Sequence, residues 1–252
     1  MVSGVAAAVF GLVVCGCATA VRIPDEAVPS ASDARDSWAQ VLRDHVDDQG
    51  RVDFVGLGKQ PLALDKWVAY VAAVSPATHP DRYPTVEDQL AYYIDAYNAI
   101  AMYGVLYSGV LPEQKIRFFF LRRYPIGGER MSLYALENDI VRPYGEPRVH
   151  FALNCMSASC PRLPREPWRG TVLDAQLEAA AVEFFEVERN LRVDDVARSV
   201  NLSGIFRFYT EDFVSKGRNL IDYVNRYRLP PIPTDYSIEF ISYDWTLNQQ
   251  PR

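Results

Sequence analysis

Apolar residues recur at three- and four-residue spacing in several segments of the chain, a period typical of amphipathic helices. The clearest such segment runs from Thr85 through EDQLAYYIDAYNAIAMYGVLY, and Thr85 and Asp88 form a pair like a capping box at its start. The same period predicts three further long helices, at 33–46, 62–74 and 173–185. Shorter helical segments are predicted at 132–141, 204–213 and 219–227.

Other segments carry short runs of β-branched and aromatic residues, which are typical of strands. Because the predicted strands are interspersed among helices without regular alternation, the pattern indicates an α+β fold and not a doubly wound one. No segment of roughly 20 to 50 residues repeats, which excludes a solenoid. We therefore predict one helix-rich α+β domain over 33–248 with a small, mostly antiparallel sheet, and a tail at 249–252. The strands are predicted at 51–54, 116–121, 149–154, 191–193, 199–202 and 238–243, with 191–193 and 199–202 paired.

Polar side chains interrupt two of the predicted helices. Asn98 lies on the same apolar stripe as Ile94, so its amide is predicted to be buried and to need hydrogen-bond partners. We interpret it as a tie between this helix and a loop, or as a group that orients a catalytic base. Glu137 and Arg142 lie within about a turn of each other, and we expect them to form an ion pair or contacts at the end of the helix.

Composition narrows the classes of function. The 252 residues are 49% apolar and 12% aromatic, which is enough to bury a sizeable core. The net charge is -6, the pI is near 5.2, and the chain contains no run of basic residues. These charges argue against a nucleic-acid partner.

The first residues resemble an export signal. The apolar run at 5–14 is too short to span a bilayer but has the length of a signal-peptide core. The sequence Val14-Cys15-Gly16-Cys17 that follows resembles a bacterial lipobox, which predicts a signal peptide at 1–17 and a lipid on Cys17. The segment 18–32, with two prolines, is then a flexible tether.

Two observations keep an alternative open: residues 1–21 contain no Lys or Arg, and an ordinary secretory signal cut near Ala18 or Ala20 fits as well. Either signal exports the protein. With a lipid on Cys17, the protein is anchored in the bacterial cell envelope and faces the periplasm.

The segment HFALNCMSASCP (150–161) holds the residues that suggest chemistry. Once Cys17 is lipidated, Cys155 and Cys160 are an even pair in an oxidising compartment, which favours a disulfide worth about 2 kcal/mol. Thiol catalysis is the alternative, and it needs a thiolate, a base and a group that orients the base. The candidates are Cys155 or Cys160, His150 as the base, and Asn98 or Asn154 as the orienting group.

We favour Cys155 slightly as the nucleophile, because it follows the predicted strand 149–154. Along that strand, however, His150 and Cys155 point to opposite faces, so the chain must turn after Leu153 if the Cys155 thiol is to approach the His150 ring. Cys160 has a different advantage, because the Cys-Pro step could open a helical turn whose free N–H groups lower the pKa of the thiol.

The sequence contains little evidence of a metal site or a nucleotide-binding site. The spacing His-x4-Cys-x4-Cys lacks the C-x2-C spacing of structural zinc sites. The chain also lacks a glycine-rich phosphate loop, a G-x-S-x-G elbow and an H-E-x-x-H motif. We predict no cofactor and no metal.

Four blocks of sequence together resemble one bacterial family of proteins, the domain of unknown function numbered 547. Many of its members are exported or lipid-anchored, and the resemblance implies the same for this chain but no activity. The histidine and cysteine block is in addition similar to a rearranged papain or transglutaminase core, with the order of Cys and His reversed. The blocks are LAYYIDAYNA (90–99), SLYALENDIVR (132–142), PRVHFALNCMSASCPRL (147–163) and YDWTLN (243–248).

Together these observations predict a cell-envelope lipoprotein that is a thiol hydrolase or acyl transferase and acts on an amide or peptide of the envelope. The alternative is a non-enzymatic binding or assembly lipoprotein, in which a Cys155–Cys160 disulfide shapes a groove for an envelope peptide or protein.

Overall fold

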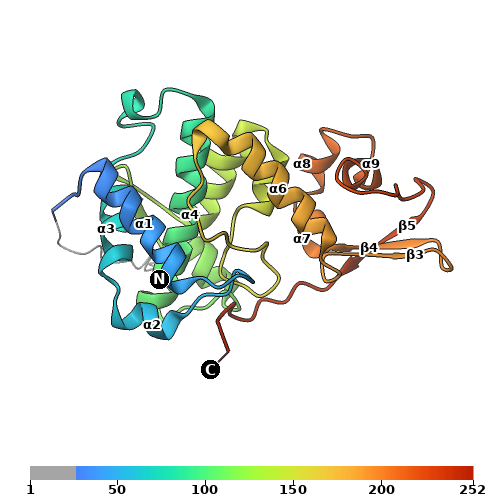
Figure 1. Cartoon of the computed structure of the whole chain (residues 1–252), viewed down its shortest axis with the longest axis horizontal. Helices are drawn as coiled ribbons and strands as arrows, with labels where there is room; N and C mark the ends of the chain where they lie inside the picture. The colour runs from blue at the N-terminus through green and yellow to red at the C-terminus, as the bar shows by residue number, and fades with distance from the viewer. Residues whose placement is uncertain (1–26, 252) are drawn as a thin grey trace, which may run out of the picture.

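The computed structural model describes residues 27–251, which form a larger helical part and a smaller mixed part (Figure 1). In the helical part α1 packs on α3 and α3 packs on α4, while the short β1–β2 hairpin lies against α3. The fold is therefore α+β, as predicted. The elements of this part are α1 (Ala31–His45), α2 (Phe54–Lys59), α3 (Leu62–Ala73), η1 (Pro80–Arg82), α4 (Val86–Ser108), η2 (Ile116–Leu121), β1 (Tyr124–Ile126), β2 (Glu129–Met131), α5 (Leu133–Ala135), η3 (Leu136–Val141), η4 (Arg142–Tyr144) and η5 (Pro147–Phe151).

The mixed part contains a three-stranded sheet and three short helices. Strand β4 lies between β3, to which it is antiparallel, and β5, to which it is parallel. The register places Leu202 opposite Leu191 and beside Phe240. The predicted pairing of the two strands is thus confirmed. The elements here are η6 (Gly170–Val172), α6 (Leu173–Glu186), β3 (Leu191–Asp194), β4 (Ser199–Ser203), α7 (Gly204–Phe208), α8 (Thr210–Val214), α9 (Leu220–Val224) and β5 (Ser237–Ile241).

Each part has its own hydrophobic core, and two segments belong to both cores. Helix α6 places Leu177 in the first core and Phe184 in the second, and Figure 1 shows it running from α4 to the sheet. The segment around η5 does the same, because Val149 packs in the first core and Phe151 in the second. The chain that carries His150 and both cysteines therefore runs along the junction of the two cores.

Helix α4 is the centre of the first core. Thr85 caps its start by accepting a hydrogen bond from the Asp88 N–H at 3.0 Å, as the capping-box pattern predicted. All positions from Leu90 to Val105 are buried, and a helix that is buried on every side needs partners for each polar group it carries.

Asn98 of α4 finds these partners in the segment that follows η5. Its amide is fully buried, Nδ2 donates to the Ala152 carbonyl at 3.0 Å, and Oδ1 accepts from the Asn154 N–H at 2.7 Å. Asn98 therefore ties the helix to the loop, which was one of its two predicted roles, and it makes no contact that would orient His150.

Three predicted strands are wrong. Residues 116–121 form the π-helical turn η2, residues 147–151 form the 3-10 helix η5, and 51–54 contributes one isolated bridge at Val52 before α2 begins. A short apolar run has no period that separates a buried strand from a buried helical turn, and Pro147 at the start of η5 suits a helical turn. The β1–β2 hairpin turns at Gly127 and Gly128, which take φ of 57° and 87°.

The predicted ends of the domain also shift. Helix α1 begins at Ala31 with Ser30 as its N-cap, so the last residues assigned to the tether are helical. Figure 1 shows the chain after β5 returning to the helical part, where Gln250 N–H donates to the Val52 carbonyl at 3.0 Å. Residues 249–250 are therefore part of the fold and not a free tail. The signal peptide, Cys17 and most of the tether lie outside the described residues.

Among residues 27–251, no helix has both the length and the apolar character needed to cross a membrane.

We expect Asn98→Ala to destabilise the protein by roughly 2 to 4 kcal/mol, because a buried carbonyl and a buried N–H both lose their partner. Urea unfolding at pH 7, followed by circular dichroism, measures the change in the free energy of unfolding. The exposed amide variant Gln114→Ala is the control and should change it by less than about 0.5 kcal/mol. A comparable small change for Asn98→Ala would contradict the role of this amide in joining α4 to the loop.

Candidate functional site

A small pocket of about 50 Å³ opens where the two cores meet. Helix α4, η3, η5, α7 and the chain after β5 each contribute to its wall. It is predominantly aromatic, and it also receives both cysteines, His150 and Glu137. The aromatic side chains are Tyr97, Phe119, Phe208, Tyr209, Tyr243 and Trp245.

A tight loop brings Cys155 and Cys160 together on one side of this pocket. Asn154 Oδ1 accepts from the Met156 N–H at 2.8 Å, and Asn154 Nδ2 donates to the Pro161 carbonyl at 2.8 Å. Met156 has a φ of 66°, a left-handed conformation that turns the chain back on itself. Asn154 thus holds both ends of the loop. Its side chain shapes the cysteine loop and does not touch His150.

Both cysteines are buried free thiols, with their sulfur atoms 3.0 Å apart. Cys160 Sγ accepts from the Cys155 N–H at 3.1 Å and from the Tyr243 hydroxyl at 3.3 Å. Ser157 Oγ lies 3.2 Å from the same sulfur and 3.0 Å from the Tyr243 oxygen, so its single proton serves one or the other. Three fixed polar groups therefore surround the Cys160 sulfur.

This surrounding makes the two thiols unequal. Burial by itself raises the pKa of the Cys160 thiol, but the hydrogen bonds from Cys155, Ser157 and Tyr243 outweigh it and lower that pKa to about 6. The hydrogen bond with Cys160, burial and the nearby negative charge raise the pKa of Cys155 well above its ordinary value. Cys160 is therefore the thiolate at neutral pH and Cys155 the thiol that donates to it. The strand end on which the slight preference for Cys155 was based does not form, because Pro147–Phe151 is a 3-10 helix, and the helical turn that the Cys-Pro step could open does not form either.

His150 lies in the same pocket, with Asp212 as its partner. Its Nε2 is 2.7 Å from Asp212 Oδ2, and its ring stacks on Tyr209 with the ring centroids 3.9 Å apart. Arg142 holds the same carboxylate with two bonds, Nε to Oδ2 at 2.7 Å and Nη2 to Oδ1 at 2.8 Å. The group that orients His150 is therefore Asp212, and neither Asn98 nor Asn154.

Asp212 lies in α8, 62 residues after His150, and no sequence pattern relates the two. A search for an acidic residue on each predicted element near the histidine could have included it among several candidates. Burial alone would raise the pKa of Asp212, but hydrogen bonds and charges from His150 and Arg142 hold it well below its ordinary range.

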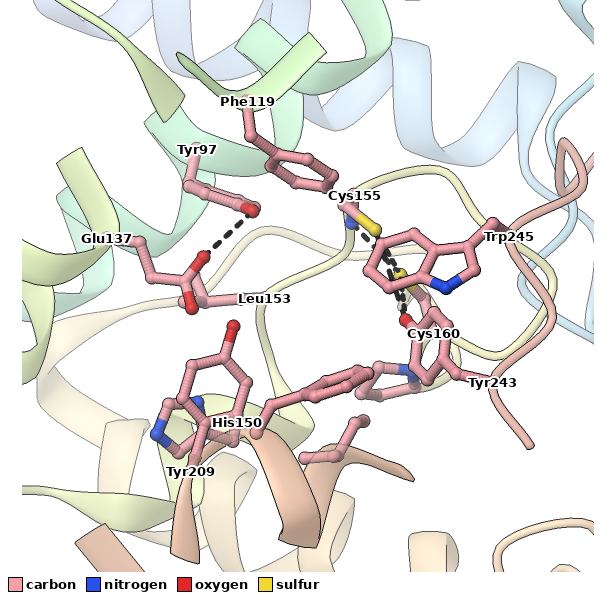
Figure 2. A pocket seen from close by; sticks show the side chains of 13 residues that line it. Tyr97, Phe119, Glu137, His150, Leu153, Cys155, Cys160, Tyr209, Tyr243 and Trp245 are labelled. Carbon is pink, nitrogen blue, oxygen red and sulfur yellow. Dashed lines mark hydrogen bonds between the residues drawn. The ribbon is translucent and has the colours of Figure 1, made fainter. Parts of the chain in front are cut away.

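Figure 2 shows how these groups share the pocket. The two sulfur atoms lie beside Tyr243 and Trp245, while His150 lies behind the Tyr209 ring. Among the described residues His150 has Asp212 as its hydrogen-bond partner and forms no hydrogen bond with either sulfur. The structure thus brings the two cysteines together and places His150 in the same pocket, without a direct bond between base and thiol.

Glu137 is a further acidic group in the pocket, and the ion pair predicted for it with Arg142 is wrong. Its carboxylate is buried and accepts from the Tyr97 hydroxyl at 3.1 Å and from the Tyr209 hydroxyl. Arg142 instead bonds Asp212 and the Asn138 side chain. The described residues contain no group of three or more His, Cys, Asp or Glu side chains that could hold a metal ion.

The fold and the site define an α+β protein with a buried pair of thiols in an aromatic pocket. The model of the family described as "Protein of unknown function, DUF547" matches residues 82–185 of this chain. The family predicted from the four sequence blocks is thus confirmed. The match includes His150 and both cysteines but ends before Asp212 and Tyr243. Neither a curated protein nor a solved structure matches the chain.

We expect Asp212→Asn to lower the free energy of unfolding at pH 7 by roughly 2 to 3 kcal/mol, because His150 and Arg142 lose a shared negative charge. The pKa of Asp212 is depressed in the folded state, so its stabilising effect is complete above the unfolded pKa of about 3.9 and is lost as the pH falls below it.

Urea unfolding at pH 7 and near pH 3 therefore should give a difference between the wild type and Asp212→Asn that shrinks at the lower pH. Asp235→Asn is the matched control, because it removes one carboxylate from an exposed ion pair with Arg198. An effect of Asp212→Asn that is no larger than that of the control would show that the His150–Asp212–Arg142 contact does not stabilise the fold.

Proposed function

We propose that this protein is a thiol-dependent hydrolase or acyl transferase that acts on an amide or peptide, with Cys160 as the nucleophile. One observation carries the proposal: the Cys160 sulfur accepts hydrogen bonds from the Cys155 N–H and the Tyr243 hydroxyl beside a pocket that both cysteines line. Buried thiols in apolar surroundings are inert, whereas a sulfur surrounded by donors is held as the reactive thiolate.

The reaction proceeds through a covalent acyl-enzyme. The Cys160 thiolate attacks the carbonyl carbon of the amide, a sulfur–carbon bond forms, and the carbon–nitrogen bond breaks as the amine leaves with a proton. Cys155, Ser157 and Tyr243 all lie within hydrogen-bond distance of the Cys160 sulfur and can supply this proton. Water or an amine then attacks the thioester, which releases the acyl group as an acid or as a new amide and restores the thiolate.

His150 has a different part in this proposal from the one the sequence suggested. Because hydrogen bonds already lower the pKa of Cys160, the nucleophile does not depend on a neighbouring base for its activation. The bond to Asp212 and the stacking on Tyr209 make His150 a support for the pocket wall in the resting protein. Replacing His150 should therefore change thiol reactivity less than replacing Tyr243.

The cellular setting of the proposal comes from the first residues of the chain. A lipid on Cys17 would anchor the protein to the membrane in the bacterial cell envelope, facing the periplasm, and an envelope peptide or protein would be its substrate. The similarity to a permuted papain or transglutaminase core is part of the same proposal and is supported by the shared use of cysteine and histidine.

A second function is favoured by the short distance between the sulfurs. At 3.0 Å, Cys155 and Cys160 can be joined with little movement of the loop by exchange with an external disulfide, which is reduced to two thiols as the pair is oxidised. The protein would then be a non-enzymatic binding or assembly lipoprotein, in which the disulfide shapes the aromatic pocket for an envelope partner.

Alkylation of the purified protein with iodoacetamide between pH 5 and 9, with and without prior reduction, distinguishes the two functions. We expect one label, on Cys160 by peptide mapping, with a midpoint near the pKa of about 6. Tyr243→Phe should raise this midpoint by roughly one pH unit because it removes a donor to the thiolate. His150→Gln is the control within the pocket and should leave the midpoint in place.

A protein that takes up no label until reductant is added would contradict the thiolate and favour the disulfide. Labelling of Cys155 with a midpoint above pH 9 would also count against Cys160 as the nucleophile.

A further inference from the structure

The pocket combines aromatic rings with one buried carboxylate, Glu137, opposite the thiols. We infer that this wall recognises a positively charged ammonium group, so that the substrate is an amide or peptide with a free amino or quaternary ammonium group near the bond that is attacked. This inference rests on the proposed function and deepens it, because it names the class of substrate.

Glu137 has the contacts of a binding group and lacks those of an ion pair. Glu137 is 5% exposed, and its carboxylate accepts from the Tyr97 hydroxyl, as Figure 2 shows, and from the Tyr209 hydroxyl. Among the described residues no Lys, Arg or His lies within ion-pair distance of it. A buried carboxylate without a cation is costly, and a ligand that brings a positive charge removes that cost.

Arg142 does not supply this charge. Its guanidinium is committed to Asp212 through two hydrogen bonds and to Asn138 through a third. The Arg142 guanidinium also lies over the Tyr209 ring, and its carbon atom is 5.5 Å from the ring centroid. Together with Asp212, Arg142 lines a different pocket. Arg142 therefore bonds Asp212 and reaches Glu137 only through a weaker Coulombic attraction, which leaves the Glu137 oxygens without a bonded cation.

The aromatic rings of the pocket, which lie between Glu137 and the thiols and beside the thiols, suit an ammonium group as well. The faces of tyrosine and tryptophan rings carry partial negative charge and attract cations within about 6 Å. Trp245 already does so within this chain, because Lys115 Nζ lies 4.3 Å from its ring centroid. Tyr209 and Tyr243 add two further rings of the same kind to the wall.

A structural role for Glu137 makes a different prediction. If the carboxylate serves only to hold two tyrosine hydroxyls, its oxygen atoms matter and its charge does not. Glu137→Gln keeps the size of the side chain and one carbonyl oxygen but removes the charge, so a test that responds to charge distinguishes the two roles.

The test uses small reagents of matched size that react with the thiolate itself. 3,3-Dimethylbutyl methanethiosulfonate is neutral, and 2-(trimethylammonio)ethyl methanethiosulfonate has the same shape but carries a permanent positive charge. In both, the Cys160 sulfur displaces methanesulfinate and forms a mixed disulfide, so the reagent supplies the oxidising equivalent. The measured quantity is the second-order rate constant for the cationic reagent divided by that for the neutral reagent. This ratio is then divided by the same ratio for 2-mercaptoethanol in solution, which gives the normalised ratio.

For the wild type we expect this normalised ratio to be about tenfold above one, since one negative charge in a poorly solvated pocket attracts the cationic reagent. Glu137→Gln should bring it to within about twofold of one. Glu211→Gln, which removes one exposed carboxylate from α8, is the matched control and should keep the wild-type ratio.

The outcomes separate the two proposals. If the neutral reagent does not label Cys160, the proposed function fails. If the neutral reagent labels Cys160 but the normalised ratio is near one, or stays high in Glu137→Gln, the thiol function stands and ammonium recognition is overturned.

A second measurement needs no variant and covers the case in which Glu137→Gln does not fold. Tetramethylammonium chloride should slow labelling of the wild type by the neutral reagent, and tert-butanol at the same concentration should not. Equal effects of the two compounds would overturn the inference.

Discussion

The buried amide of Asn98 connects the centre of the helical core to the loop that carries the chemistry. It holds the Ala152 carbonyl and the Asn154 N–H, and Asn154 in turn closes the loop from Cys155 to Cys160. Asp95, one turn earlier on α4, accepts the Trp168 N–H at 3.1 Å and fixes the chain beyond that loop. Two polar groups on one buried helix thus determine where the cysteines lie, and the rest of the pocket is built around them.

The charged groups of the pocket are separated into two sets with different effects. The His150–Asp212–Arg142 set is balanced within itself, and it joins η5 to α8 across the junction of the two cores. The thiols and Glu137 lack such a balance, because the Cys160 charge is held by hydrogen-bond donors and Glu137 by two tyrosine hydroxyls. Reactivity and ligand binding are therefore expected where the charges are uncompensated, while the compensated set supports the wall.

The sequence predicted secondary structure best where the residue pattern within one segment is enough to define its conformation. The capped helix from Thr85, the period of α1, α3 and α6, and the β3–β4 pair follow from local patterns, and the structure confirms them. The burial of Asn98 could be predicted for the same reason, because its place on the apolar stripe depends on the helix alone. Short apolar runs such as 116–121 and 149–154 were misjudged, since their state depends on what packs against them.

By itself, the sequence determined the α+β class, the family, and the set of candidate groups His150, Cys155 and Cys160 within one short block. Tertiary structure alone decided which of these groups meet. Asp212 and Tyr243 approach the block from 62 and 83 residues further along the chain, and they do so because the second core folds back onto η5 and the C-terminal segment returns to the first core. Hydrogen bonds between such distant segments leave no period or spacing in the sequence, and they determine which cysteine is the thiolate and which residue orients the histidine.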